Sequence, residues 1–198
     1  FAPASFPIQT NQVIAYMGNS GSSTGPHLHF EIRNTMNEHV LNPLEYGIKL
    51  EDDIKPTLYN LKFYGQSTAS EIPFVNIPVK KEPSGNFKLE KDTFQFNTNK
   101  AGIAFKAYDQ SKGSSQRLGI YGAKLYIDDQ LHYHFDMDDF SFDEMRYSNA
   151  HRDYEEQSKS RQVFHRLFRL DGNRLPIYKQ TINDGWVSLE ETVQKIKI

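Results

Sequence analysis

The distribution of charge along the chain constrains its fold more than any other feature. Residues 1–50 hold five charged side chains, whereas the other 148 residues hold 43. The first thirty residues carry no formal charge and are rich in Gly, Ser, Pro and Thr. Such a segment is unsuited to a solvated helix and favours tight loops around short strands. We therefore predict two domains, residues 1–50 and 51–198, joined near the acidic segment EDDIKP.

Alternating apolar residues predict a mostly β fold in the second domain. The segment 120–128 places Ala123, Leu125 and Ile127 at every second position, and a turn at 128–129 leads into a return strand at 130–136. The remaining expected elements are strands at 58–64, 74–79, 87–90, 103–108, 163–170 and 186–189, a short helix within 141–158, and turns at 171–173 and 183–185. Strands of this length between turns predict an Ig-like antiparallel β-sandwich with a short helix.

Composition excludes several classes of protein. The net charge of −2 argues against a nucleic-acid partner and against a polybasic membrane-surface protein. No apolar run approaches 18 residues, so we expect no transmembrane segment. The absence of cysteine excludes disulfides and thiolate metal sites. The chain opens without a methionine or a signal peptide, and we expect it to be the C-terminal part of a longer polypeptide.

One motif, GNSGSSTGPHLHFEIR at residues 18–33, carries candidate chemistry. If residues 28–32 form a strand, alternation places His27, His29 and Glu31 on one face. The opposite face, with Leu28, Phe30 and Ile32, is then expected to pack in a core. Neutral imidazoles bind Zn²⁺, and the preceding glycine-rich run exposes amide donors that can hold an extended peptide near a metal.

Other histidines provide an internal comparison. His132 and His134 show the same spacing, but they lie in a charged hairpin without a glycine-rich approach, so we interpret them as a solvated strand face. His39, His151 and His165 are predicted to be surface or structural residues. A polar-aromatic cluster is expected either to tie loops together or to bind glycan or peptide. Its members are Tyr147, His151, Asp153 and Tyr154.

The string GNSGSSTGPHLHFE, followed by Asn42-Pro43, resembles the signature of the lysostaphin-type (LytM-like) zinc metallopeptidases, which cleave the peptide cross-links of bacterial peptidoglycan. The resemblance covers about residues 6–47. It implies that His29 is a Zn²⁺ ligand and that His27 is the catalytic histidine acting on the zinc-bound water. It also implies a substrate groove lined by Ser20, Gly21, Ser23, Thr24 and Gly25. The second domain resembles, less specifically, the β-sandwich that follows the catalytic domain in envelope peptidases of Bacteroidetes-type bacteria.

The chain departs from the family pattern upstream of the motif. The family has a His and an Asp ligand in H-x-x-x-D and a further catalytic His before H-x-H, and no histidine precedes His27 here. The resemblance therefore implies the C-terminal portion of a peptidase domain, built on a partial antiparallel sheet. The predicted function is a zinc endopeptidase acting on peptidoglycan peptides when upstream ligands are present. The alternative is a non-catalytic relative that binds cell wall or regulates another hydrolase.

The resemblance also sets expectations for location and partners. A peptidoglycan substrate implies a cell-envelope location, periplasmic or surface-exposed. The expected partner is a peptidoglycan peptide, and the second domain is expected to pack on the peptidase domain.

Overall fold

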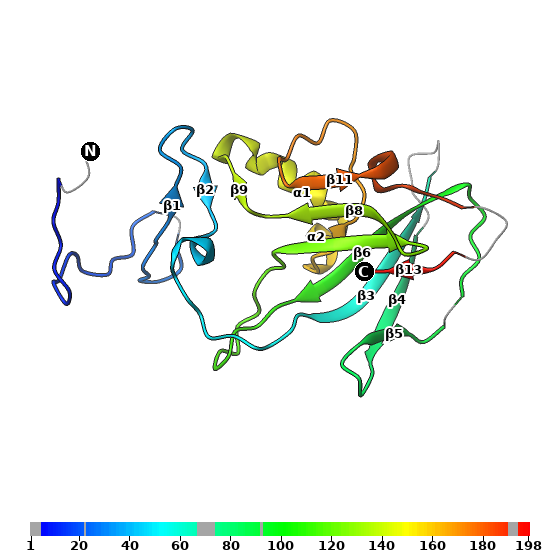
Figure 1. Cartoon of the computed structure of the whole chain (residues 1–198), viewed down its shortest axis with the longest axis horizontal. Helices are drawn as coiled ribbons and strands as arrows, with labels where there is room; N and C mark the ends of the chain where they lie inside the picture. Colours follow the sequence, from blue (N-terminus) through cyan, green and yellow to red (C-terminus); the bar gives the residue numbers. More distant parts are fainter. Residues whose placement is uncertain (1–4, 22, 67–73, 92, 190–193) are drawn as a thin grey trace. The chain divides into compact units, whose positions relative to one another are not determined.

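The computed structural model describes residues 5–21, 23–66, 74–91, 93–189 and 194–198 (Figure 1). The chain forms two compact units, residues 1–32 and residues 33–198, which we call the first and second units. The fold is mostly β, as predicted, with antiparallel strands and short helices. The boundary between the compact units lies between Ile32 and Arg33, and the domain boundary near residue 50 stays a prediction.

The first unit has little regular structure. Its described residues form an isolated antiparallel bridge between Gly18 and His27, and strand β1 (Ile32–Arg33) begins only at its end. The predicted strand at 28–32 is therefore wrong for residues 28–31, because an extended segment becomes a strand only when a neighbour accepts its backbone hydrogen bonds. The prediction that this segment buries an apolar face is also wrong, since Leu28 is 84% and Phe30 60% exposed.

The second unit contains two larger antiparallel sheets. One has the strand order β10-β6-β3-β4-β5, with β12 also paired to β6, and the other has the order β11-β8-β7-β13. In addition, β2 pairs with β9. The strands are β2 (Val40–Leu41), β3 (Thr57–Gly65), β4 (Phe74–Lys81), β5 (Phe87–Leu89), β6 (Lys100–Tyr108), β7 (Gly122–Ile127), β8 (Gln130–Asp136), β9 (Asp139–Phe140), β10 (His165–Arg166), β11 (Tyr178–Thr181), β12 (Val187–Ser188) and β13 (Ile196–Lys197).

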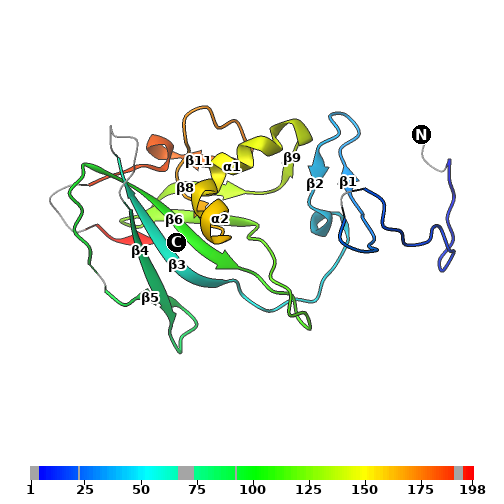
Figure 2. The ribbon, with the colours of Figure 1, turned by 180° about the vertical axis from the view of Figure 1, so that it is seen from behind.

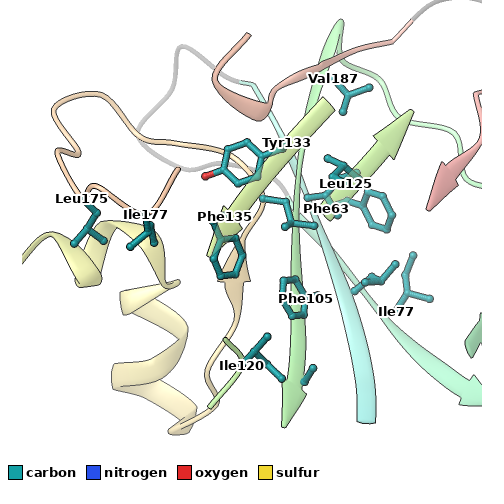
Figure 3. Close-up of a cluster of buried hydrophobic side chains, with 14 residues drawn as sticks. Phe63, Ile77, Phe105, Ile120, Leu125, Tyr133, Phe135, Leu175, Ile177 and Val187 are labelled. Carbon is teal, nitrogen blue, oxygen red and sulfur yellow. The ribbon is translucent and has the colours of Figure 1, made fainter. Parts of the chain in front are cut away.

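Both sheets contribute side chains to one apolar cluster (Figure 3). On β8, Tyr133 and Phe135 are fully buried, and Leu125 on β7 is buried beside them, as the period-two pattern predicts. Phe63 of β3 and Phe105 of β6 reach the same cluster from the other sheet. The two sheets therefore share a core, and the Ig-like character of this arrangement stays a prediction.

The opposite face of β3 and β6 is also covered. Gly102 and Ala104 on β6 leave room for the ring of Phe168, and a Cβ added to Gly102 would lie 2.8 Å from that ring. Tyr64 of β3 joins this smaller cluster with Phe164. The segment 163–170, predicted as one strand, pairs only as β10, because its residues serve two clusters: Leu167 enters the main core, whereas Phe164 and Phe168 enter the smaller one.

The predicted helix within 141–158 is present as three short pieces. A 3₁₀ helix, η2 (Phe142–Tyr147), runs into α1 (Ser148–His151), and α2 (Tyr154–Ser160) follows. Figure 2 shows α2 in front of β3 and β6. Two further 3₁₀ turns are η1 (Pro43–Tyr46) and η3 (Ile182–Gly185).

Candidate functional site

The loop that precedes the two histidines is closed by its own backbone. The amide of His27 donates to the carbonyl of Gly18 at 3.3 Å, so residues 18–27 form a loop whose ends meet. Gly21 has a φ of +79°, a conformation that other residues rarely adopt. A Cβ built on Gly21 or Gly25 meets no atom within 4 Å, so the loop presents open backbone.

The imidazole of His27 is held by that loop in one tautomer. Its Nδ1 lies 3.1 Å from the carbonyl oxygen of Gly25 and 3.0 Å from Oγ of Ser23. The hydroxyl of Ser23 already donates to the same carbonyl at 2.7 Å. The carbonyl can only accept, so the proton lies on Nδ1, and Nε2 of His27 keeps a free lone pair.

The imidazole of His29 is held from the other side of the motif. Its Nε2 lies 2.6 Å from Oε1 of Glu31, so Nε2 donates to the carboxylate and Nδ1 is left with the lone pair. The His29 side chain is 68% exposed and that of Glu31 19%. The contact places His29 and Glu31 on the same side of the chain, as predicted, although the segment is not a regular strand.

This donor set fits a zinc ligand. Metal-bound histidines commonly donate their second N–H to a carboxylate, which fixes the ring and raises the basicity of the ligating nitrogen, and Glu31 stands in that relation to His29. Within the part of the chain that the structure describes, no group of three or more His, Cys, Asp or Glu side chains is placed to hold a metal ion. His29 therefore fits as one ligand of such a site.

The predicted groove residues flank His27 in the loop. Ser20, Gly21 and Thr24 are exposed, whereas Ser23 and Gly25 are half-buried because they carry the hydrogen bonds to the His27 ring. Their role as a substrate groove stays a prediction. What the structure adds is that Ser23 and Gly25 orient His27, a contact that H-x-H spacing alone does not reveal.

The histidines of β8 have structural partners. Nε2 of His132 lies 3.3 Å from the carbonyl oxygen of Trp186, and burial lowers the pKa of His132. His134 pairs with Asp136 at 2.8 Å. Both side chains are half-buried and lie opposite the core face of β8.

A buried ionic network joins β3 to α2, and no motif in the sequence predicts it. Nζ of Lys62 lies 2.8 Å from Asp153 and 2.8 Å from Glu156, and the hydroxyl of Tyr64 donates to Asp153 at 2.6 Å. Lys62 is 3% exposed and Asp153 4%. Burial raises the pKa of Asp153, but the hydrogen bonds from Lys62 and Tyr64 outweigh it and the net pKa is lowered.

Beside this network lies a buried pair of histidines. Nε2 of His151 is 3.2 Å from Nδ1 of His165, and the rings are 1% and 6% exposed. The polar-aromatic cluster predicted around His151 is thus structural at His151 and Asp153, whereas Tyr154 is 56% exposed. The two histidines lie 14 residues apart, so no ligand spacing in the sequence points to their contact.

A hollow of about 400 Å³ lies where residues 40–44 meet residues 118–121 and 137–140. The polar side chains at one end of the hollow are paired with one another. Tyr121 donates to Asp138, and Lys179 pairs with the same carboxylate at 2.5 Å. The hydrogen bond from Lys179 lowers the pKa of Asp138, and the hydrogen bond that Tyr121 donates to Asp138 raises the pKa of Tyr121. The walls of the hollow are mainly apolar.

Comparison with known proteins finds a family match at the N-terminal end of the sequence. Residues 5–43 match the model of peptidase family M23. The matched segment contains His27, His29 and the whole glycine-rich loop, and it supports a hydrolase of the peptidase kind, in agreement with the resemblance to lysostaphin-type enzymes. No curated protein and no solved structure matches the chain. No helix in the described residues is long and apolar enough to cross a bilayer.

Proposed function

We propose that this chain carries part of the active site of a zinc-dependent endopeptidase that cleaves peptide cross-links or stem peptides of bacterial peptidoglycan. The observation that carries the proposal is the set of contacts that hold the two histidine rings. Each ring has one nitrogen occupied by a hydrogen bond within the chain and the other nitrogen available. Both histidines lie in the segment that matches peptidase family M23.

In this proposal His29 binds the metal through Nδ1, and Glu31 holds the ring. Bound zinc supplies a Lewis acid and a water whose pKa is lowered to about 7. His27 takes a proton at Nε2, while its Nδ1–H keeps its contacts with the carbonyl of Gly25 and the hydroxyl of Ser23. The imidazole is exposed, so a peptide can reach it from solvent.

The exposure of the first unit supports a site that further polypeptide completes. None of its described residues is buried, and eight large apolar side chains are 60–94% exposed. A surface of this kind is usually covered by further polypeptide. We propose that the covering polypeptide brings the other metal ligands, a His and an Asp in H-x-x-x-D, and that the complete enzyme acts in the cell envelope.

The test uses the longest natural polypeptide that contains this chain. His29→Ala is expected to abolish zinc retention in a metal assay, whereas His27→Ala is expected to keep zinc and lose hydrolysis of purified peptidoglycan. His39→Ala is the matched control, since it changes a histidine outside the H-x-H pair. Full zinc content and hydrolysis in the His29 variant would overturn the assignment. If the natural polypeptide lacks an upstream H-x-x-x-D and binds peptidoglycan without cleaving it, the non-catalytic alternative replaces the proposal.

A further inference from the structure

The segment 148–160, which contains α1 and α2, is attached to the sheets almost entirely through polar groups. We call this segment the helical strap. Its only buried residues are His151 and Asp153, and neither helix buries an apolar side chain. Most elements of the second unit are held by apolar packing, which is insensitive to pH. The strap is held instead by hydrogen bonds and ion pairs. Some of these do not change with pH: the amide of Asp153 donates to Phe164, and Arg166 donates to the carbonyls of Ala150 and Arg152. The contact between His151 and His165 does depend on protonation.

The contact between His151 and His165 requires that at least one of the two rings is neutral. Across 3.2 Å, one nitrogen must donate and the other must accept. An imidazolium donates from both nitrogens, so the contact is lost when both rings are protonated. Nδ1 of His151 is buried and has no hydrogen-bond partner among the described residues, so a proton placed there also lacks an acceptor.

The surroundings of the pair disfavour positive charge. Phe135 of β8 packs on the His151 ring with centroids 4.6 Å apart, and Phe105 of β6 stacks on the His165 ring at 5.4 Å. Tyr178 of β11 lies 6.1 Å from the His151 ring. These neighbours are aromatic and offer an imidazolium no carboxylate.

The charged groups nearby are already paired or are themselves cationic. Arg152 and Arg166 face the pair and lower the pKa of His151 further. The carboxylate of Asp153 lies 3.5 Å from Arg166, and its other oxygen is taken by Lys62 and Tyr64. The remaining carboxylate, Glu156, also pairs with Lys62.

We propose that the helical strap is released by acid: it stays on the sheets while His151 and His165 are neutral and detaches when they take up protons. Burial lowers the pKa of His151 to about 3, and this pKa returns to about 6.5 once the strap is in water. His165, whose pKa burial lowers to about 4, lies in β10 and stays stacked on Phe105. The released strap therefore binds one more proton at His151 below pH 6.5, and linkage raises the released fraction by about 70-fold between pH 7 and pH 4.5.

Cleavage by a glutamate-specific protease that works from pH 4 to pH 8 measures this release. The bonds after Glu155 and Glu156 lie in α2, and their cleavage rate in the full chain is divided by the rate on a free peptide of residues 150–161. The circular-dichroism band of the strands is followed in the same samples. We expect the normalised rate to rise about 70-fold between pH 7 and pH 4.5 while the strand band stays native.

Variants test whether the acid-dependent cleavage depends on His151 and His165. In the double variant His151→Gln, His165→Gln we expect the normalised rate to change less than tenfold over the same range. His134→Gln, which removes a histidine outside the pair, is expected to keep the wild-type profile. The single variant His151→Gln, expected to lose most of the rise, serves if the double variant does not fold.

Three results would overturn the proposal. One is a normalised rate in the wild-type chain that does not rise with acid. Another is a rise that coincides with loss of the strand band, which would mean global unfolding and no local release. The third is an unchanged rise in the double variant or in the His151→Gln variant. None of these measurements depends on peptidase activity, so the proposal stands or falls apart from the proposed function.

Discussion

The candidate catalytic residues lie in one unit of this chain, and the apolar core lies in the other. The first unit carries the paired histidines and most of the segment that matches a peptidase family, yet none of its described residues is buried. The second unit carries the shared core of two sheets and a buried ionic network, and the family match ends at residue 43, before that core. A site can therefore be locally ordered by hydrogen bonds within a loop while its stability depends on what covers it.

Truncation of a core residue gives the largest contrast between the units. Phe135→Ala removes a fully buried ring that contacts the main cluster and His151, so we expect a loss of about 4 kcal/mol in the free energy of unfolding. Leu28→Ala, at an 84% exposed position of the first unit, is expected to change it by less than about 0.5 kcal/mol. Urea unfolding followed by circular dichroism measures both. A large loss at Leu28 would show that the first unit is packed in solution.

The buried ionic network gives the next largest effect. Asp153→Asn keeps the size and the helix-capping ability of the side chain but leaves Lys62 and Arg166 with less compensating charge. We expect a loss of about 3 kcal/mol. The matched change Asp129→Asn breaks an exposed pair with Lys195 and is expected to cost less than about 1 kcal/mol. Equal losses in the same urea assay would mean that the network contributes no more than a surface pair.

The histidine pair makes the second unit sensitive to mild acid. Because the pKa values of His151 and His165 are lower in the folded chain than the usual 6.5, the unfolded chain binds more protons below that pH, and stability falls as pH falls. We expect a loss of about 2 kcal/mol between pH 7 and pH 5.5, measured by urea unfolding at each pH. The His151→Gln, His165→Gln variant is expected to flatten this dependence, and a profile that stays as steep would assign it to other groups.

A glycine pair tests the smaller cluster. Gly102→Ala places a methyl group 2.8 Å from the ring of Phe168, so we expect a loss of about 1.5 kcal/mol through overpacking. At Gly25 in the first unit an added Cβ meets nothing within 4 Å. Gly25→Ala is accordingly expected to leave the unfolding midpoint unchanged. A neutral Gly102→Ala would show that Phe168 can move aside at little cost.

The sequence predicts contacts between residues close together in the chain better than contacts between distant residues. The hairpin of β7 and β8 was predictable, because alternation and a two-residue turn are local signals, and Asp128 and Asp129 both adopt positive φ there. The pairing of Lys62 with Asp153 joins residues 91 positions apart, and no local pattern in the sequence predicts it. Alternation at residues 28–31 suggests a strand. The sequence pattern does not show whether a neighbouring strand pairs with this segment, and in the structure none pairs with residues 28–31.

The same reasoning holds for the candidate site. Residue types and the glycine-rich approach identified His27 and His29, because the motif is contiguous. The orientation of each ring depends on which nearby oxygen accepts its proton, and that depends on the path of the loop through Ser23 and Gly25. Loop conformation is not encoded in periodicity, so those contacts emerged only from the structure.

The smallest expected effect on stability tests the orientation of His29. Glu31→Ala removes the acceptor of the His29 Nε2 proton, and an exposed pair of this kind contributes less than about 0.5 kcal/mol to folding. The tautomer is nevertheless expected to change: with Glu31 present the proton stays on Nε2, and without it the ring samples both nitrogens. Nitrogen chemical shifts of the imidazole above pH 7.5 distinguish the two states, and Glu38→Ala is the control. If the variant and the parent chain show the same shifts, Glu31 does not set the tautomer, and the assignment of Nδ1 as the metal-binding atom loses its basis.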